Sequence, residues 1–292
     1  MVQKPGANQE LAMAFLTQAT ALLPADDPGP EEVRWLNALA TNQTGLAGEV
    51  LAKAIKAGTK NDTMRLQWCM DTINLGIRTS GGVMVPADKA LLVADMLQAV
   101  AANNPRQLAT YRLLADVMPS VSPAREQDRQ TLVKARETLR ADDEIIQLGL
   151  IAWRWRNGEL PAAGREMKAF EPGPEATAFV KSYADWLRAQ LGAEERLMAY
   201  HDAVSRGKFL EAGAVFNGIQ AQYTLVPHLA EDYRASRLEL QYFNLTVQAQ
   251  DYLANDNPDA ARVLLEEMSG VELAPRMREI VDTMLNRIRE GK

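Results

Sequence analysis

The chain of 292 residues is 47% hydrophobic, which supplies enough apolar surface for one elongated or two compact folded domains. A formal net charge of −6 excludes both a highly charged disordered chain and a strongly basic nucleic-acid-binding protein. Aromatic residues make up only 6% of the chain, whereas Ala, Leu, Gln, Glu and Arg are plentiful, a mixture that favours helices.

The first 80 residues are predicted to form N-terminal helical hairpins (domain 1–80). Apolar residues recur there every three or four positions, which is the spacing of one helix face. Pro30 suits a first helical turn, and Gly58 suits a C-terminal cap. The predicted helices cover residues 8–23, a segment that begins at Pro30, 46–58 and 62–78.

Residues 81–142 are predicted to be middle helices, either continuous with the array that follows or separate from it. The first of these helices runs from Pro86 to about residue 102. The second follows the turn at 103–107 and ends at Val117, and the third covers 123–140. The run "GVMV" (82–85) is short and isolated, and a lone strand has no partner with which to pair. We therefore expect an all-α protein.

Three turns in the second half of the chain superpose at constant spacing. They are "NGELPAAGREM" (157–167), "RGKFLEAGAVF" (206–216) and "NDNPDAARVLL" (255–265). Their small residues Ala163, Ala212 and Ala261 are 49 positions apart in both intervals. Such equal spacing predicts a structural repeat of helix pairs over residues 143–292.

Each position of this repeat has a physical role in a helical hairpin. Gly158, Gly207 and Asp256 would let the chain turn sharply. A large residue just after the turn would close the end of the hairpin, and the Ala three residues later would allow close helix approach. A second large residue, one helical turn further on, would lock the pair. These large residues are Leu160, Phe209 and Pro258 after the turn, then Met167, Phe216 and Leu265.

The pattern resembles the tetratricopeptide repeat family, with "RGKFLEAGAVF" (206–216) as the closest match and "IAWRWRNGELPAAGREM" (151–167) as the next. The period of 49 is longer than the family's 34, so longer helices or an extra helix are expected. The resemblance implies an α-solenoid of antiparallel helix hairpins. The last helix, from residue 274 to 292, would cap the array.

The "WRWRN" segment (153–157) raises a choice between a nucleic-acid surface and a packed helix. Two apolar stripes run along 144–157, which predicts burial of Trp153 and Trp155 on two sides. Arg154 shares the remaining polar face with Gln147. No basic run surrounds the Trp pair, so we expect structural packing, with a peptide-binding role for Trp155 as the alternative.

No catalytic or cofactor motif is present in the sequence. The chain has one cysteine and two histidines, too few at suitable spacing for a zinc site. Cys69 lies in an apolar helical context and is expected to be a buried core residue. Neither a phosphate-binding glycine loop nor a serine nucleophile elbow occurs. We expect no enzyme activity, no cofactor and no metal.

The leading functional hypothesis is a scaffold or adaptor that holds a peptide or partner protein in the concave face of the array. The family resemblance places the first helix of each pair along that face. It nominates, for partner binding, Trp155, Glu194, His201, Phe243 and Gln250. Residues 143–292 hold 23 acidic against 17 basic side chains, which favours a partner of basic or mixed character.

Two other functions remain open at this point. The protein could be a subunit of a self-assembling complex, joined through the apolar stripe of its C-terminal helix. It could less readily be a helical-repeat enzyme, which would need paired carboxylates in a cavity. The opening residues lack the apolar core of a signal peptide, and no apolar run approaches a membrane span. A cytoplasmic location is expected, with a periplasmic one as the alternative if an N-terminal signal was removed.

Overall fold

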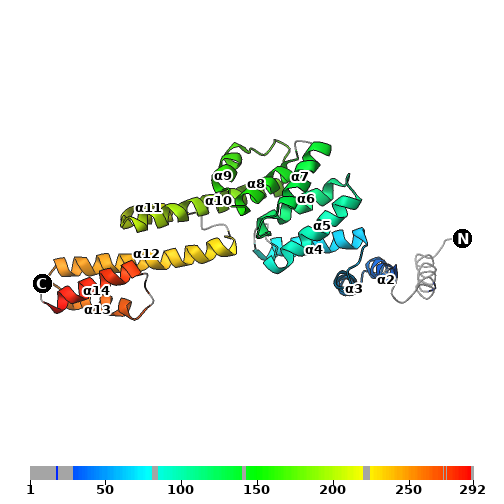
Figure 1. Cartoon of the computed structure of the whole chain (residues 1–292). Coiled ribbons are helices and arrows are strands. Elements are labelled where there is room, and N and C mark those ends of the chain that lie inside the picture. Colours follow the sequence, from blue (N-terminus) through cyan, green and yellow to red (C-terminus); the bar gives the residue numbers. More distant parts are fainter. Residues whose placement is uncertain are drawn as a thin grey trace. The chain divides into compact units, whose positions relative to one another are not determined.

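The structure is a computed structural model that describes residues 18, 29–80, 85–139, 143–219, 224–271, 273 and 275–290 (Figure 1). The described residues form helices and contain no strand. The elements are α2 (Gly29–Ala40), α3 (Thr44–Lys56), α4 (Asp62–Ser80), α5 (Ala87–Asn103), α6 (Leu108–Val117), the 3-10 turn η1 (Met118–Ser120), α7 (Glu126–Thr138), α8 (Glu144–Arg156), α9 (Leu160–Ala169), α10 (Ala178–Ser205), α11 (Phe209–Asn217), α12 (Pro227–Ala254), α13 (Pro258–Ser269) and α14 (Pro275–Arg289).

The predicted all-α class is confirmed, whereas the arrangement of the hairpins into one solenoid stays a prediction. The helix expected over 8–23 lies outside the described residues apart from Gln18. Of the strand-like run at 82–85, only Val85 is described, and it precedes α5 without pairing. Two helices have side-chain N-terminal caps: Asp143 accepts a hydrogen bond from the N–H of Ile146 at the start of α8, and Asn257 accepts one from the N–H of Ala260 at the start of α13.

The chain divides into two compact units, residues 1–184 and 185–292. This division differs from the boundary expected at 142/143, because α8 and α9 belong to the first unit. There α8 contacts α6, α7, α9 and η1. The beginning of α10 is attached to the same unit, since the Tyr183 hydroxyl donates a 3.1 Å hydrogen bond to the carbonyl of Ala115. The hairpins of the 49-residue spacing accordingly fall in both units, with α9 in the first and α11 and α13 in the second.

The turns between paired helices share one hydrogen-bond pattern. A residue in the left-handed region donates its N–H to the carbonyl three residues earlier, and the next residue donates to the carbonyl five residues earlier. These left-handed residues are Asn42, Gly58, Gly158, Gly207 and Asp256, with φ between 55° and 81°. Three of them are the turn residues singled out from the repeat, so the predicted sharp turns are confirmed.

The alanine positions of the repeat are fully buried in all three hairpins. Ala163, Ala212 and Ala261 each have 0% of their surface exposed, on α9, α11 and α13. The locking residues one turn later are also buried: Met167, Phe216 and Leu265. The closing position differs, because Leu160 is buried whereas Pro258 is exposed and instead occupies the first turn of α13. Helices α10 and α12, of 28 residues each, account for the long period.

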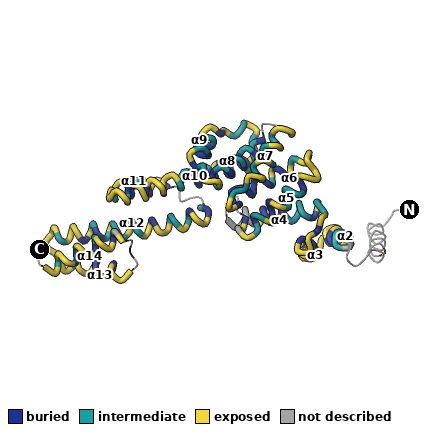
Figure 2. The backbone as a smooth tube through the Cα atoms, in the orientation of Figure 1, coloured by how far each residue is buried: buried dark blue, intermediate teal, exposed yellow. Residues whose placement is uncertain are grey.

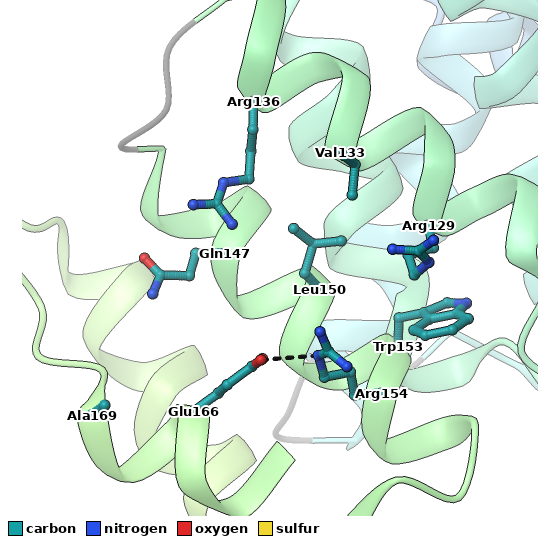
Figure 3. A pocket seen from close by; sticks show the side chains of 9 residues that line it. All are labelled: Arg129, Val133, Arg136, Gln147, Leu150, Trp153, Arg154, Glu166 and Ala169. Atoms are coloured by element: carbon teal, nitrogen blue, oxygen red, sulfur yellow. Dashed lines mark ion pairs between the residues drawn. The ribbon is translucent and has the colours of Figure 1, made fainter. Parts of the chain in front are cut away.

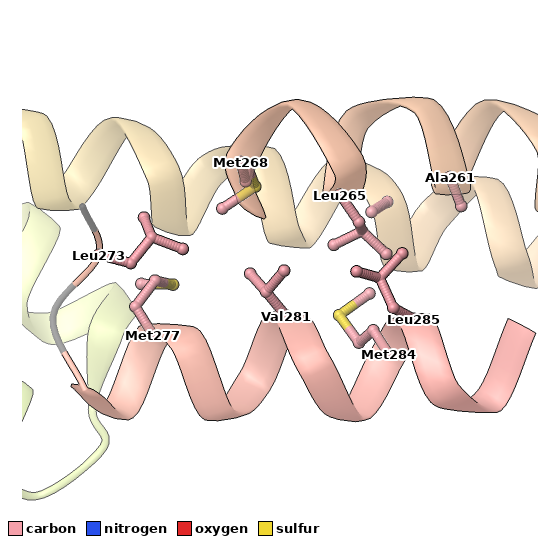
Figure 4. Packing of buried hydrophobic residues seen from close by; sticks show 9 residues of the cluster. Ala261, Leu265, Met268, Leu273, Met277, Val281, Met284 and Leu285 are labelled. Carbon is pink, nitrogen blue, oxygen red and sulfur yellow. The ribbon is translucent and has the colours of Figure 1, made fainter. Parts of the chain in front are cut away.

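The C-terminal helix α14 contributes its apolar stripe to the core of the second unit (Figure 4). In Figure 4, Met277 lies beside Leu273, whereas Val281 and Leu285 point towards Leu265 and Met268 of α13. Because these residues are at most 7% exposed, they are unavailable to a second copy of the chain. The buried part of the stripe therefore packs within the unit, whereas Ile280 and Ile288 of the same stripe are only partly buried, and self-association through this helix stays a prediction.

Burial is uneven along the chain (Figure 2). Helix α8 is buried on most of its length, including Trp153 and Trp155 at 5% and 3% exposed, which confirms that this pair packs within the protein. Cys69 is buried as expected, and burial raises the pKa of its thiol to about 12. Among the helices that the structure describes, none is long and apolar enough to cross a bilayer.

Candidate partner-binding groove

A groove of about 260 Å³ lies on the second unit, between α10, α12 and the segment that enters α14. Its lining combines apolar side chains with polar ones at the edge. The lining residues are His201, Ala235, Ser236, Leu238, Glu239, Tyr242, Leu273 and Met277. We refer to this surface as the α12 groove.

The apolar floor of the α12 groove is continuous with the core of the unit. Leu273 and Met277 are buried members of the C-terminal cluster, and half-buried Tyr242 packs against it. Leu238 is different, because 47% of its surface is exposed. The floor of the groove thus belongs to the packed core, whereas the Leu238 side chain is open to solvent.

Glu239 is positioned at the groove by a buried tyrosine on α10. The single proton of the Tyr200 hydroxyl is shared between Oε2 of Glu239 at 2.9 Å and the Ser236 carbonyl at 3.1 Å. Burial, and then the hydrogen bond to Glu239, raise the pKa of Tyr200 well above its usual range. The hydroxyl therefore stays protonated and fixes the direction in which the carboxylate points.

A second acid lies close by, paired with the histidine of the groove. Nε2 of His201 is 2.8 Å from Oδ1 of Asp232, and both side chains are partly exposed. The Tyr200 ring packs edge-on against the His201 ring, with centroids 5.3 Å apart. The acidic side of the groove thus consists of the lining residue Glu239 and of Asp232, which lies about two turns earlier on α12 and pairs with the lining residue His201.

The structure separates the five residues nominated from the sequence. Only His201 lines the α12 groove. Trp155 is buried in the first unit, so it has no surface to offer a partner in this arrangement. Phe243 stacks on Phe209, with ring centroids 4.4 Å apart, and so holds α11 against α12. Glu194 is half-buried on α10, and Gln250 is exposed on α12 beyond the groove lining.

Most residues of the groove lining were not predicted from the sequence, although four of them share one face of a predicted helix. Ala235, Leu238, Glu239 and Tyr242 follow the spacing of one helix face, so they could have been grouped from the sequence. The family register favoured Phe243 instead, which is one position away from the lining residue Tyr242. Leu273 lines the groove because tertiary packing places it in the C-terminal cluster, and no local sequence pattern indicates this contact.

The described residues contain no group of His, Cys, Asp and Glu side chains arranged to hold a metal ion. Comparisons of the chain with protein-family models, with curated proteins and with solved structures gave no match. The tetratricopeptide resemblance accordingly stays an expectation from the residues alone.

Proposed function

We propose that this protein is an interaction scaffold that binds a basic, amphipathic polypeptide segment in the α12 groove. The observation that carries the proposal is the combination of an exposed Leu238, an apolar floor, the lining acid Glu239 and a second acid, Asp232, paired with the lining residue His201. A segment with apolar residues on one side and Lys or Arg beside them would match this surface in shape and charge.

Charge supports a basic partner beyond the groove itself. Residues 185–292 carry 17 acidic against 12 basic side chains. Asp232 and Glu239 would meet cationic side chains directly, while the remaining excess would speed the approach of a basic segment. An acidic or neutral segment would gain only the apolar contact with Leu238 and Tyr242.

A photo-crosslinking residue at position 238 of the full chain, expressed in its native host, tests this proposal. Leu210 on α11 provides the matched control position, because it is 84% exposed in the same unit but does not line the groove. We expect a protein adduct at position 238 that is absent at 210, and a basic amphipathic sequence in the crosslinked peptide. Equal labelling at both positions, or an acidic crosslinked segment, would overturn the proposal.

A binding measurement with defined peptides provides the second test. The probes are two labelled helix-forming peptides of about 14 residues, or four turns, one with Leu and Lys and the other with Leu and Glu. Fluorescence anisotropy should show tighter binding of the Lys peptide. Glu239→Gln should weaken that binding several-fold while keeping an acceptor for Tyr200. Glu266→Gln, an exposed charge removal on α13, should leave it unchanged.

A further inference from the structure

The first unit contains a second hollow, of about 330 Å³, whose chemistry is opposite to that of the α12 groove (Figure 3). It lies between α7, α8 and α9. Its lining residues are Arg129, Val133, Arg136, Gln147, Leu150, Trp153, Arg154, Glu166 and Ala169. We refer to it as the arginine pocket, because three guanidinium groups surround the side chain of Leu150.

Two of the three arginines already have acidic partners within the protein. Arg129 binds Glu126 at 2.9 Å and places its guanidinium over the Trp153 ring, 5.5 Å from the centroid. Trp153 is held in turn by a 2.9 Å hydrogen bond from its indole N–H to the carbonyl of Arg125. This wall of the pocket is therefore fixed before any ligand arrives.

Arg154 is the most heavily engaged of the three. Its guanidinium binds Oε2 of Glu159 at 2.8 Å. It also binds Oε1 of Glu166 at 3.0 Å, as the dashed line in Figure 3 shows. Hydrogen bonds from Asn157 and Arg154 hold the pKa of Glu159 below its usual range, so this partner is ionised at neutral pH. One guanidinium thus takes up two carboxylates.

This double engagement leaves Arg136 without a matching acid. Among the described residues, the structure gives Arg136 no ion pair and no side-chain hydrogen bond, and the same holds for the Gln147 amide. Both side chains are half-buried and lie along the pocket, one from α7 and the other from α8 (Figure 3). Half-buried Val133 and Leu150 lie between them and the Trp153 wall.

We propose that the arginine pocket binds one carboxylate that is carried on an apolar group. The planar guanidinium of Arg136 matches a carboxylate with two parallel hydrogen bonds, and the Gln147 amide N–H can donate another. The apolar part of the ligand would cover Val133 and Leu150. A dianionic phosphate fits less well, because only one guanidinium is unmatched and the Glu166 carboxylate would repel a second negative charge.

The site is independent of the α12 groove, since its residues belong to the other unit and its ligand has the opposite charge. The carboxylate could come from a free aliphatic acid or from an acidic side chain flanked by apolar residues in a polypeptide. Both sources share the chemistry that Arg136 and Gln147 recognise, and separate arms of one experiment distinguish them.

Ligand-observed NMR titrations of the full chain test this proposal with four probes. They are hexanoate, its neutral analogue hexanamide, inorganic phosphate and the acidic peptide acetyl-Leu-Glu-Leu-amide. We expect binding of hexanoate or the peptide and no binding of hexanamide. Binding of hexanoate assigns the site to free acids, and binding of the peptide alone assigns it to polypeptide carboxylates.

Arg136→Gln should weaken carboxylate binding by about tenfold or more, because it removes a charge-assisted hydrogen-bond pair. Arg165→Gln is the matched control, since Arg165 is an exposed arginine of α9 that does not line the pocket. Helicity and melting temperature of both variants show whether they fold. The proposal is overturned if neither carboxylate probe binds. It is also overturned if hexanamide or phosphate binds as tightly as the carboxylate probe that binds, or if Arg136→Gln binds that probe like the wild type.

Discussion

Gly149 on α8 lies directly against Ala115 on α6. A Cβ atom at Gly149 would be 2.4 Å from the Ala115 Cβ and 2.6 Å from its Cα, which is closer than real atoms approach. The two helices therefore pack backbone to backbone at this point, and Gly149 is what allows it. This contact is one reason why α8 belongs to the first unit.

Gly149→Ala should destabilise the protein, because the methyl group meets backbone atoms that cannot move aside. We expect a loss of about 1–3 kcal/mol in the free energy of unfolding, measured by urea denaturation. Gly192→Ala is the control with the opposite sign. Gly192 lies inside α10 with nothing within 4 Å of its added Cβ, so the variant should gain roughly 0.5–1 kcal/mol. Similar effects at both sites would contradict the close α6–α8 contact.

The alanines of the repeat allow a second test of packing. Ala212→Leu on α11 should cost about 1–3 kcal/mol, because the residue is fully buried and the larger side chain must displace its neighbours. Ala214→Leu, two positions away on the exposed side of the same helix, should change the free energy of unfolding little. Thermal unfolding of the two variants checks this. If both unfold at the same temperature, Ala212 has no special role in helix approach.

These alanines show how much of the fold the sequence specifies. The turn residues, the buried Ala163 and the locking Met167 were predictable because each depends on a short stretch of chain with its own backbone requirement. The division into units was not predictable in the same way. It depends on contacts such as Gly149 with Ala115, which join residues far apart in the sequence and leave no periodic signal.

The candidate sites show the same difference between features that the sequence predicts and features that depend on tertiary packing. The polar face formed by Gln147 and Arg154 was visible in the sequence, yet Arg136 became part of the arginine pocket only through the packing of α7 beside α8. The role of Glu239 was likewise hidden, because Tyr200 comes from another helix, 39 positions earlier. Helix periodicity gives the face on which a residue lies, but the opposing element comes from tertiary packing.

The buried hydroxyl of Tyr200 leads to a third prediction. Tyr200→Phe removes the hydrogen bonds to the Glu239 carboxylate and to the Ser236 carbonyl, of which the first is a bond to a charged group. We expect a loss of about 1–3 kcal/mol in the free energy of unfolding. Tyr252→Phe on α12, where the side chain is 42% exposed, should be nearly neutral. Equal stability of the two variants in urea would show that the hydroxyl contributes nothing.

The last prediction concerns pH and Asp116, a buried carboxyl on α6. Burial raises its pKa to about 8, the nearby positive charge of Arg112 lowers it in part, and the negative charge of Asp143 raises it further. Its Oδ1 has no hydrogen-bond partner among the described residues. The negative charge of Asp116 also contributes, after burial, to the raised pKa of Tyr183.

The sign of the effect follows from the raised pKa. The folded state keeps the Asp116 carboxyl protonated over a range of pH in which the unfolded chain has already released its proton. The contribution of this group to stability is therefore complete below about pH 4, falls as pH rises, and is lost by about pH 8. Asp116→Asn mimics the protonated form and does not titrate, so its stability should not fall with pH on account of this site.

Urea denaturation of the wild type and Asp116→Asn between pH 4 and pH 8 measures this effect directly. The difference in the free energy of unfolding should grow with pH in favour of the variant, reaching on the order of a few kcal/mol at the upper end. Other carboxylates titrate equally in both proteins and cancel in the difference. Asp185→Asn, at an exposed carboxylate of α10, serves as control and should give a difference that is small across the range. A constant difference for Asp116→Asn would mean that this carboxyl is ionised in the folded protein, with Arg112 compensating its charge.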